Sequence, residues 1–589
     1  MDNFFLNFKK SFSHVYKNAK GAFYITIIQA IVNASQVYVL AYINRLILNR
    51  LSIALNLEPN WQDVLVPIVE VVILNWLIVL LYSAVGKIFQ YYMAKSTLKY
   101  NIIATQQLYT KLANMDISYF DNPQENNHVK QAYQDMVGYF SLFQSAVGLF
   151  LAFFSFVLSF VIIVRFNPLL TVLVLVSLIP SFFLKRYIRK SNYDLERSLN
   201  GLNRRVDYLG GIFQGQHSAQ DLRLYPSFFR MAMNKYVFYS EKRNSEKMAL
   251  QRKNSLWEVG YAILYGLLNV LINIYILFTI IKKTLAIGDL SYYTTITGNL
   301  GKNVESCFTS ISELALSNAR VTNYRLFLEK KPEVDREGTD PVADLSVHTF
   351  EFHDVTFRYP NTDKDVLRCV SFSFSSNQKI AFAGLIGCVK TTLIKLLLRF
   401  YDPTSGEIYL DGKNIKEYDV VSYRNLFSAM FQNFANYSFT VEENVTLSDE
   451  NVDRKKVLDI LEQFGMSHIS LDAEYSKTFS EDGLIFSKGQ AQLFNMMRAF
   501  YCDASVYIFD EPSASMDAKA EAAIVDHLFD HVLEKGFVFI SHRLSNLKNM
   551  DQIVYLENGQ ILESGTHEQL INNGGEYSKL YYSQLKRYI

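Results

Sequence analysis

The chain has 589 residues and a formal net charge of +1 at pH 7, with 50% apolar and 20% charged residues. The length allows several domains. The near-neutral charge disfavours a basic nucleic-acid binder, so no nucleic-acid partner is expected. Four widely spaced cysteines form no CxxC metal site; they are Cys307, Cys369, Cys388 and Cys502.

Residues 1–20 predict an amphipathic helix lying on the cytoplasmic face of a membrane, with membrane lipid as a partner. A frayed polar terminus is the alternative. A cleavable signal peptide is disfavoured, because no short apolar region with a small-residue cleavage site follows. The apolar positions are Phe4, Phe5, Leu6, Phe8 and Phe12, and the basic ones are Lys9, Lys10, Lys17 and Lys20.

Long apolar stretches follow this helix. A membrane helix needs about 20 residues, and most of the stretches are long enough. Hydropathy supports four or five spans, because a sixth stretch around 291–317 is less apolar. The five others are Ala22–Leu46, Val64–Leu81, Phe143–Val164, Leu169–Leu184 and Gly260–Ile281.

Two long polar segments separate these stretches, at Lys95–Gln134 and Lys185–Lys253. Their basic residues flank the spans closely, which places both segments in the cytoplasm. Solvated amphipathic helices without a partner are the alternative.

Ionisable residues inside membrane spans are costly and often functional. Lys302 and Glu305 lie in the polar sixth stretch, three residues apart and therefore on one helix face. Either they contact a substrate, or they pair with each other. Two further carboxylates within spans are Glu70 and Glu258. Polar neighbours make the sixth stretch a plausible lining for a polar or amphipathic cargo; they are Thr294, Thr295, Thr297, Asn299, Asn303 and Ser306.

Residues 329–345 form a charged, Pro- and Gly-containing linker. The segment from 346 onward begins with β-rich runs and continues with alternating strands and helices, which predicts an α/β domain.

A phosphate-binding loop is predicted within that domain. Residues 384–392 read G-L-I-G-C-V-K-T-T, between a strand-like run and a helix-like run. In such a loop the backbone N–H groups face the phosphates, Lys390 reaches the β/γ oxygens, and the Thr391 hydroxyl suits Mg²⁺. The expected cofactors are therefore ATP and Mg²⁺.

One residue departs from the phosphate-loop pattern. Val389 stands where a glycine is usual, and a β-branched residue there costs about 1–3 kcal/mol of strain or displaces the phosphate. Cys388 inside the loop is read as a small space-filling residue, with a redox switch as the alternative.

An apolar strand over 506–509 ends in two carboxylates. Asp510 is expected to hold the metal and Glu511 to polarise an attacking water. Together with the loop, these residues indicate a nucleotide triphosphatase.

Further motifs make the chain resemble ABC transporters, specifically an exporter half with its membrane domain fused ahead of the ATPase. Phe486-Ser487-Lys488-Gly489-Gln490 resembles the ABC signature, and Gln432 resembles the Q-loop glutamine. The segment 513–517, ending at Asp517, resembles the D-loop, His542 resembles the switch histidine, and Tyr359 lies where the family stacks an aromatic on adenine. The order and number of these motifs carry the resemblance.

The resemblance implies an all-α six-helix transmembrane domain of ABC exporter type fused to an α/β P-loop ABC ATPase domain. The domains are then 1–20 (elbow helix), 21–328 (transmembrane domain with cytoplasmic helical extensions), 329–345 (linker) and 346–589 (nucleotide-binding domain). The long polar segments would end in coupling helices that touch the nucleotide domains. The location implied is a bacterial cytoplasmic (inner) membrane, crossed several times, with the nucleotide domain in the cytoplasm.

The site residues implied by the resemblance fall into three groups. The catalytic ones are Glu511, His542 and Gln432, and the metal-binding ones are Thr391, Gln432 and Asp510. The nucleotide-binding ones are Tyr359, Gly384, Gly387, Cys388, Val389, Lys390, Thr391, Thr392, Asp510, Ser487, Gly489, Gln490 and Asp517.

The family mechanism needs a second half-transporter, because Ser487, Gly489 and Gln490 of one chain close over ATP held by the other. Phe486, Lys488 and Val389 depart from the family pattern. A heterodimer is favoured over a homodimer, since each composite site then carries either the altered phosphate loop or the altered signature rather than both. A slow but active site is the favoured interpretation.

The resemblance predicts ATP-driven export, and the segment 431–444 is similar to exporters of ribosomal peptides, which makes a peptide the expected cargo. A multidrug or lipid exporter is one alternative. A nucleotide-sensing half that does not hydrolyse ATP, in a heterodimeric transporter, is the other.

Overall fold

The computed structural model describes residues 2–56, 61–215, 218–282, 285–332, 334, 338–384, 390–512 and 535–586. Contacts divide the chain into two units. The first unit comprises Met1–Thr110 and Gln131–Glu329, and the second comprises Lys111–Lys130 and Lys330–Ile589.

The first unit is built from long helices. Five of the described helices contain segments long and apolar enough to cross a membrane: α2, α3, α6, α7 and α9. The helices are α1 (Asp2–Asn18), α2 (Lys20–Asn56), α3 (Trp61–Ala113), α6 (Gly138–Phe166), α7 (Pro168–Gln214), α8 (Ala219–Leu224), α9 (Pro226–Lys282) and α10 (Ile287–Glu329).

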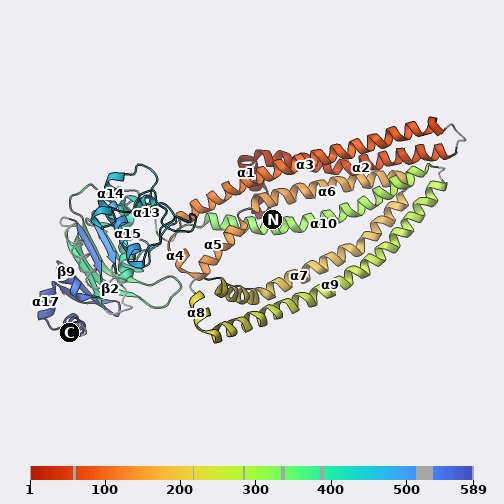
Figure 1. Ribbon diagram of the computed structural model, residues 1–589. Helices are drawn as coiled ribbons and strands as arrows, with labels where there is room; N and C mark the ends of the chain where they lie inside the picture. Colours follow the sequence, from red (N-terminus) through yellow and green to blue (C-terminus); the bar gives the residue numbers. More distant parts are fainter. Residues whose placement is uncertain are drawn as a thin grey trace. The chain divides into compact units, whose positions relative to one another are not determined.

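Several of these helices are much longer than a bilayer is thick. Helix α9 has 57 residues, which at 1.5 Å per residue is about 85 Å, against about 30 Å for the hydrocarbon core. Helices α7 and α9 run side by side (Figure 1). Their outer parts therefore continue well beyond the membrane.

Helix α10 covers the polar sixth stretch and packs on α6 and α2. Asn299 Nδ2 lies 3.3 Å from Tyr38 Oη on α2, and Asn303 Nδ2 lies 3.4 Å from Ser159 Oγ on α6. Hydrogen bonds between helices satisfy polar groups that lipid cannot. These hydrogen bonds give polar side chains of α10 partners on the neighbouring helices α2 and α6.

The alternative in which Lys302 pairs with Glu305 does not describe the structure. Glu305 instead forms an ion pair with Lys185 on α7, and no ion pair of Lys302 occurs within the described part of the chain. The three-residue spacing identified a shared helix face, but the partner came from another helix.

The second unit contains two sheets. The smaller one is antiparallel, in the order β2-β1-β4-β5. The larger one has the order β10-β9-β3-β8-β7-β6, in which all neighbouring strands are parallel except β10 and β9. The strands are β1 (Thr349–Phe357), β2 (Leu367–Ser375), β3 (Lys379–Gly384), β4 (Ser405–Leu410), β5 (Lys413–Asn414), β6 (Phe427–Met430), β7 (Val506–Asp510), β8 (Gly536–Ile540), β9 (Gln552–Glu557) and β10 (Gln560–Gly565).

Every residue of β7 and β8 is buried, as expected for strands covered on both faces. Helices α13, α14 and α15 gather beside the sheets (Figure 1) and enclose a hydrophobic cluster of their own. The described helices of this unit are α4 (Ser118–Asp121), α11 (Lys390–Leu397), α12 (Val420–Arg424), α13 (Val441–Thr446), α14 (Arg454–Gln463), α15 (Lys488–Tyr501), α17 (His567–Asn572) and α18 (Glu576–Leu585), with 3₁₀ turns η1 (Ile415–Glu417) and η2 (Leu544–Leu547). Helix α5 (Pro123–Asp135) begins in this unit.

Residues 111–130 belong to the second unit, although the sequence assigns them to the predicted transmembrane domain 21–328. Polar contacts explain the grouping. Asp116 Oδ2 accepts a hydrogen bond from the Val334 N–H at 3.2 Å, and Lys330 Nζ lies 2.5 Å from Glu125 Oε2. Within the second unit, these contacts join the polar segment after α3 to the segment that begins at Lys330.

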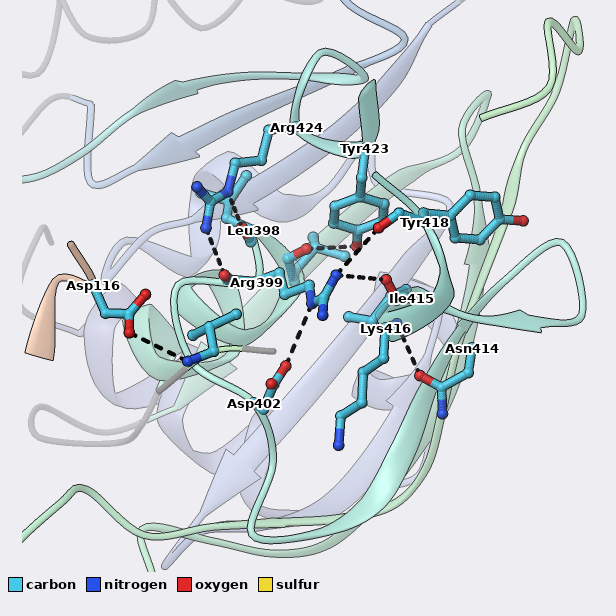
Figure 2. A network of polar contacts seen from close by, with 12 residues as sticks. Asp116, Leu398, Arg399, Asp402, Asn414, Ile415, Lys416, Tyr418, Tyr423 and Arg424 are labelled. Atoms are coloured by element: carbon cyan, nitrogen blue, oxygen red, sulfur yellow. Dashed lines mark hydrogen bonds and ion pairs between the residues drawn. The ribbon is translucent and has the colours of Figure 1, made fainter. Parts of the chain in front are cut away.

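A buried network secures the C-terminal end of α11 (Figure 2). The last carbonyls of a helix lack intrahelical partners. Tyr423 Oη donates to the Leu397 carbonyl at 2.6 Å, and Arg424 donates to the carbonyls of Leu398 and Arg399, at 3.1 and 2.7 Å. Helix α12 therefore caps α11.

The Arg399 side chain is fully buried in the same network (Figure 2). Its guanidinium donates to the Ile415 carbonyl at 3.0 Å and lies 3.5 Å from Asp402 Oδ1. A buried cation is tolerated when it is paired and hydrogen-bonded in this way.

Replacing Arg399 by Met is expected to destabilise the second unit by about 2–4 kcal/mol, because buried carbonyls lose a charged donor. The measurement is the thermal unfolding midpoint of the full-length protein in detergent. Lys413→Met is the matched control, since that lysine makes partly exposed ion pairs. An Arg399→Met midpoint equal to the control's would show that the network adds nothing to stability.

Candidate functional site

The candidate site lies at one edge of the six-stranded sheet. Carboxyl ends of parallel strands meet at the same edge, and β3, β6, β7 and β8 run in the same direction. Gly384 ends β3, Glu511 follows β7, Gln432 follows β6 and His542 follows β8. The topology thus gathers residues from four separate parts of the sequence.

The Glu511 carboxylate is held from two sides. Gln432 Nε2 donates to its Oε2 at 2.7 Å, and His542 Nε2 lies 2.5 Å from its Oε1. Glu511 also has a φ of 53°, in the left-handed region that non-glycine residues rarely adopt. A strained residue with a fixed side chain is a common feature of functional sites.

Burial and a nearby lysine act on His542. Burial lowers the pKa of its imidazole and the positive charge of Lys390 lowers it further, while Glu511 acts in the opposite direction. The net shift is downward. At neutral pH the ring is therefore largely neutral, so it carries both a donor and an acceptor nitrogen.

Asp510 lies at the end of β7 and is almost completely buried. Its Oδ2 accepts a hydrogen bond from Thr391 Oγ1 at 2.9 Å. Its Oδ1 is also buried and has no hydrogen-bond partner among the described residues. Burial raises the pKa of Asp510 to about 6; the Thr391 hydrogen bond and Lys390 lower it, and Glu511 raises it.

These groups fit a hard divalent cation, because Mg²⁺ binds hydroxyl and carboxylate oxygens. The free Oδ1 of Asp510 and the Thr391 hydroxyl are such donors. Among the described residues no cluster of three or more His, Cys, Asp and Glu side chains has metal-binding geometry. The protein groups at this edge therefore suit a metal that takes its remaining ligands from phosphate oxygens and water.

Lys390 is the first residue of α11 and is only 3% exposed. Its ammonium donates to the Gly384 carbonyl at 2.9 Å. The Thr392 hydroxyl lies 3.0 Å from Tyr359 Oη. Lys390 and Tyr359 are thus both linked to the first turn of α11, and a phosphate at this helix start would find the lysine already in place.

Tyr359 is half-buried in an aromatic cluster. Its ring packs edge-on against Phe357 and Tyr401, with centroid distances of 5.0 and 5.4 Å. The predicted adenine platform is therefore a fixed ring rather than a free surface side chain.

The signature-like segment forms the start of α15. Ser487 is the N-cap, and its side chain and that of Gln490 form a capping box with each other's backbone N–H groups. Phe486 packs against Tyr475 and Phe494, both at 4.7 Å between ring centroids. Phe486 is therefore a partly buried residue that packs against the hydrophobic cluster of α13, α14 and α15.

Lys488 is exposed at the first position of α15, and Gly489 follows it. Lys488 thus extends into solvent in the single chain. Gly387, Cys388, Val389 and Asp517 lie outside the described residues.

The sequence did not identify two polar residues near this edge. Gln492 on α15 donates to the Glu511 carbonyl at 3.5 Å. Asp121 on α4 lies 2.9 Å from Lys395 Nζ on α11. Gln492 belongs to no short motif, and nothing in the sequence signals the pairing of Asp121 with Lys395.

Activity that depends on a bound divalent cation at Asp510 is expected to fall as the pH decreases through about 6, because a proton on that carboxyl competes with the cation. Raising the Mg²⁺ concentration should therefore move the acidic midpoint to lower pH. The measurement is ATP hydrolysis against pH at two Mg²⁺ concentrations. A midpoint that does not respond to Mg²⁺ would contradict the assignment.

Comparison with known proteins gives matches to ABC transporters. The sequence profile of the family described as ABC transporter matches residues 367–514. The chain is 28% identical over 526 residues to the subtilin transport ATP-binding protein SpaT of Bacillus subtilis, covering 87% of this chain and 85% of that protein. It is 22% identical over 527 residues to the nisin transport ATP-binding protein NisT of Lactococcus lactis subsp. lactis, covering 88% of each.

A solved structure described as a bacterial Atm1-family ABC exporter with ATP bound has the same fold. Its TM-score is 0.75 at 19% sequence identity, covering 95% of this chain and 98% of that chain. The similarity spans both the helical unit and the unit with the two sheets.

Proposed function

Because this chain is an ABC exporter, with its ATPase domain behind a multi-pass domain in the cytoplasmic membrane, we propose that it exports a peptide with energy from Mg²⁺-dependent ATP hydrolysis. The ATPase domain lies in the cytoplasm. The observation that carries the hydrolytic part is the set of contacts around Asp510 and Glu511.

The residues at the sheet edge have distinct proposed roles. Lys390 binds the β/γ-phosphate oxygens, and Thr391 and Asp510 hold Mg²⁺, with Gln432 in reach of both metal and water. When bound, Mg²⁺ neutralises the charge on the β- and γ-phosphate oxygens. Tyr359 stacks on adenine, beside the start of α11.

Glu511 is the proposed general base. It orients the attacking water and accepts its proton, while His542 and Gln432 hold its carboxylate. Both carboxylate oxygens are already engaged, so at least one contact must open before water reaches Glu511. Binding of ATP and closure of the dimer are the events proposed to open it.

The active unit is a dimer of half-transporters. We propose that Ser487, Gly489 and Gln490 close over ATP held by the other chain. The similarity to the relatives does not support a heterodimer over a homodimer. That preference stays a prediction resting on Val389 and Lys488: a homodimer carries both departures in each composite site, whereas a heterodimer carries one.

A peptide is the proposed cargo for two reasons. The relatives described above are named for the transport of subtilin and nisin. The polar face of α10 also leaves Thr295, Lys302 and Ser306 exposed in the single chain. Mixed polar and cationic groups suit a flexible amphipathic peptide better than a purely apolar molecule.

The test is ATP-dependent uptake of a labelled lantibiotic-type peptide into inside-out proteoliposomes. The Glu511→Gln protein is the matched control, because it should bind ATP without turning it over. Uptake that needs both ATP and Glu511 supports peptide export. Uptake of a fluorescent lipid or a dye, with no uptake of peptide, would favour the lipid or multidrug alternative instead.

A further inference from the structure

Side-chain contacts connect Tyr359, the residue proposed to stack on adenine, to a segment that precedes the linker by about 200 residues of sequence. Lys395, on α11, has its ammonium 5.6 Å from the ring centroid of Tyr359 and 5.7 Å from that of Tyr401. A cation within about 6 Å of an aromatic face is attracted to it. Lys395 thus lies against both rings.

Asp121, the last residue of α4, holds this arrangement from the other side. Its Oδ2 lies 2.9 Å from Lys395 Nζ and accepts a hydrogen bond from Tyr401 Oη at 2.9 Å. The side chain of Lys395 is 22% exposed and that of Asp121 is 45% exposed. One carboxylate oxygen therefore fixes the two groups that flank Tyr359.

The aromatic packing makes the arrangement continuous. Tyr359 and Tyr401 meet edge to face at an interplanar angle of 86°. Tyr359 Oη also contacts the Thr392 hydroxyl in the first turn of α11. A displacement of Lys395 or Tyr401 would therefore change the contacts that hold the Tyr359 ring.

We propose that Asp121 is a positioning residue for nucleotide binding, which sets the Tyr359 ring through Lys395 and Tyr401. The proposal rests on the proposed stacking of adenine on Tyr359. Asp121 itself would touch no part of the nucleotide. Its role is to keep the ammonium and the phenol in the places that fix the ring.

One consequence concerns coupling between α4 and ATP. If the position of α4 changes the affinity for ATP, then bound ATP must change the preferred position of α4 by the same free energy. Helix α4 lies in the polar segment that follows the long helix α3. The Asp121 contact would thus link that segment to base recognition through Lys395 and Tyr401.

The experiment compares ATP hydrolysis by four full-length variants in nanodiscs: Asp121→Asn, Tyr359→Leu, the double variant and Glu125→Gln. Asp121→Asn is expected to raise KM for ATP roughly three- to tenfold with kcat little changed, because it removes a charge next to a cation–π contact. Glu125→Gln is the matched control. It removes another ion pair of the same segment, with Lys330, away from Tyr359.

The double variant separates positioning from general loosening of the segment. If Asp121 acts through Tyr359, adding Asp121→Asn to Tyr359→Leu should raise KM no further. Independent, multiplicative effects would overturn the proposal, and so would an equal rise in KM for Glu125→Gln. An unchanged KM for Tyr359→Leu alone would instead refute the stacking of adenine on Tyr359. That outcome would contradict the proposed nucleotide site, and it is distinguishable from a failure of the proposed role of Asp121.

Discussion

Replacing Glu511 by Gln is expected to reduce steady-state ATP hydrolysis at least about 100-fold, because a general base contributes on the order of 10²–10⁴ in rate. The amide keeps the size of the side chain and still accepts a hydrogen bond from Gln432. Binding of ATP should therefore persist. The measurements are phosphate release and ATP binding by the purified chain in nanodiscs.

Glu462→Gln is the control for this substitution, because it changes an exposed carboxylate on α14. Loss of turnover in Glu511→Gln alone would establish a hydrolytic half that works without another protein. Retention of turnover by a complex that contains Glu511→Gln would instead indicate a nucleotide-sensing half whose partner carries out the chemistry. No hydrolysis by the unmodified chain, despite ATP binding, would point to a missing partner half.

Replacing Lys390 by Met is expected to weaken ATP binding by roughly 30- to 5000-fold, since losing one partner of a buried charge pair costs on the order of 2–5 kcal/mol. Lys390 is almost fully buried at the start of α11. Methionine has a similar length and no charge, so the packing is retained while the phosphate loses its cation.

The measurement is binding of a fluorescent ATP analogue in the presence of Mg²⁺, together with the unfolding midpoint. Lys413→Met serves as the control. Because methionine also removes the hydrogen bond to the Gly384 carbonyl, the midpoint of Lys390→Met is measured to confirm that the variant remains folded. Unchanged ATP affinity with a stable fold would show that the lysine does not contact the phosphates.

The parts of the fold that follow from local pattern are predictable from the sequence. The apolar run that ends at Asp510 can be recognised as a buried strand, and β7 is buried along its whole length. The strand-like run from Lys379 is β3, and the helix after the phosphate loop starts at Lys390. In these segments hydrophobic period and turn residues agree, so little depends on tertiary context.

Pairings between distant segments are not predictable in the same way. Lys302 and Glu305 share a helix face, but Glu305 pairs with Lys185 on another helix. Local spacing identifies neighbours within one helix and carries no information about which helix packs alongside. The contact of Asp121 with Lys395 is likewise a product of tertiary structure.

Helix α10 contains the sixth stretch, which hydropathy does not identify as a span. Asn299 and Asn303 make the segment polar in sequence, yet they meet Tyr38 and Ser159 on neighbouring helices. A hydropathy scale assigns each polar side chain the cost of facing lipid, whereas here the cost is offset by a partner. Among the described residues five helices are long and apolar enough to be spans, and α10 is not one of them.

The length of α9 has a mechanical consequence. With about 85 Å of helix and about 30 Å of bilayer, some 55 Å of α9 lies outside the hydrocarbon core, allowing for both ends. A tilt of about 5° at the membrane would displace the far tip by roughly 4 Å, somewhat less than the rise of one helical turn, about 5.4 Å. A small change in the tilt of the membrane-spanning part of α9 would therefore produce a larger displacement at its far end. The size of that displacement then depends on bending stiffness along the helix rather than on any single contact.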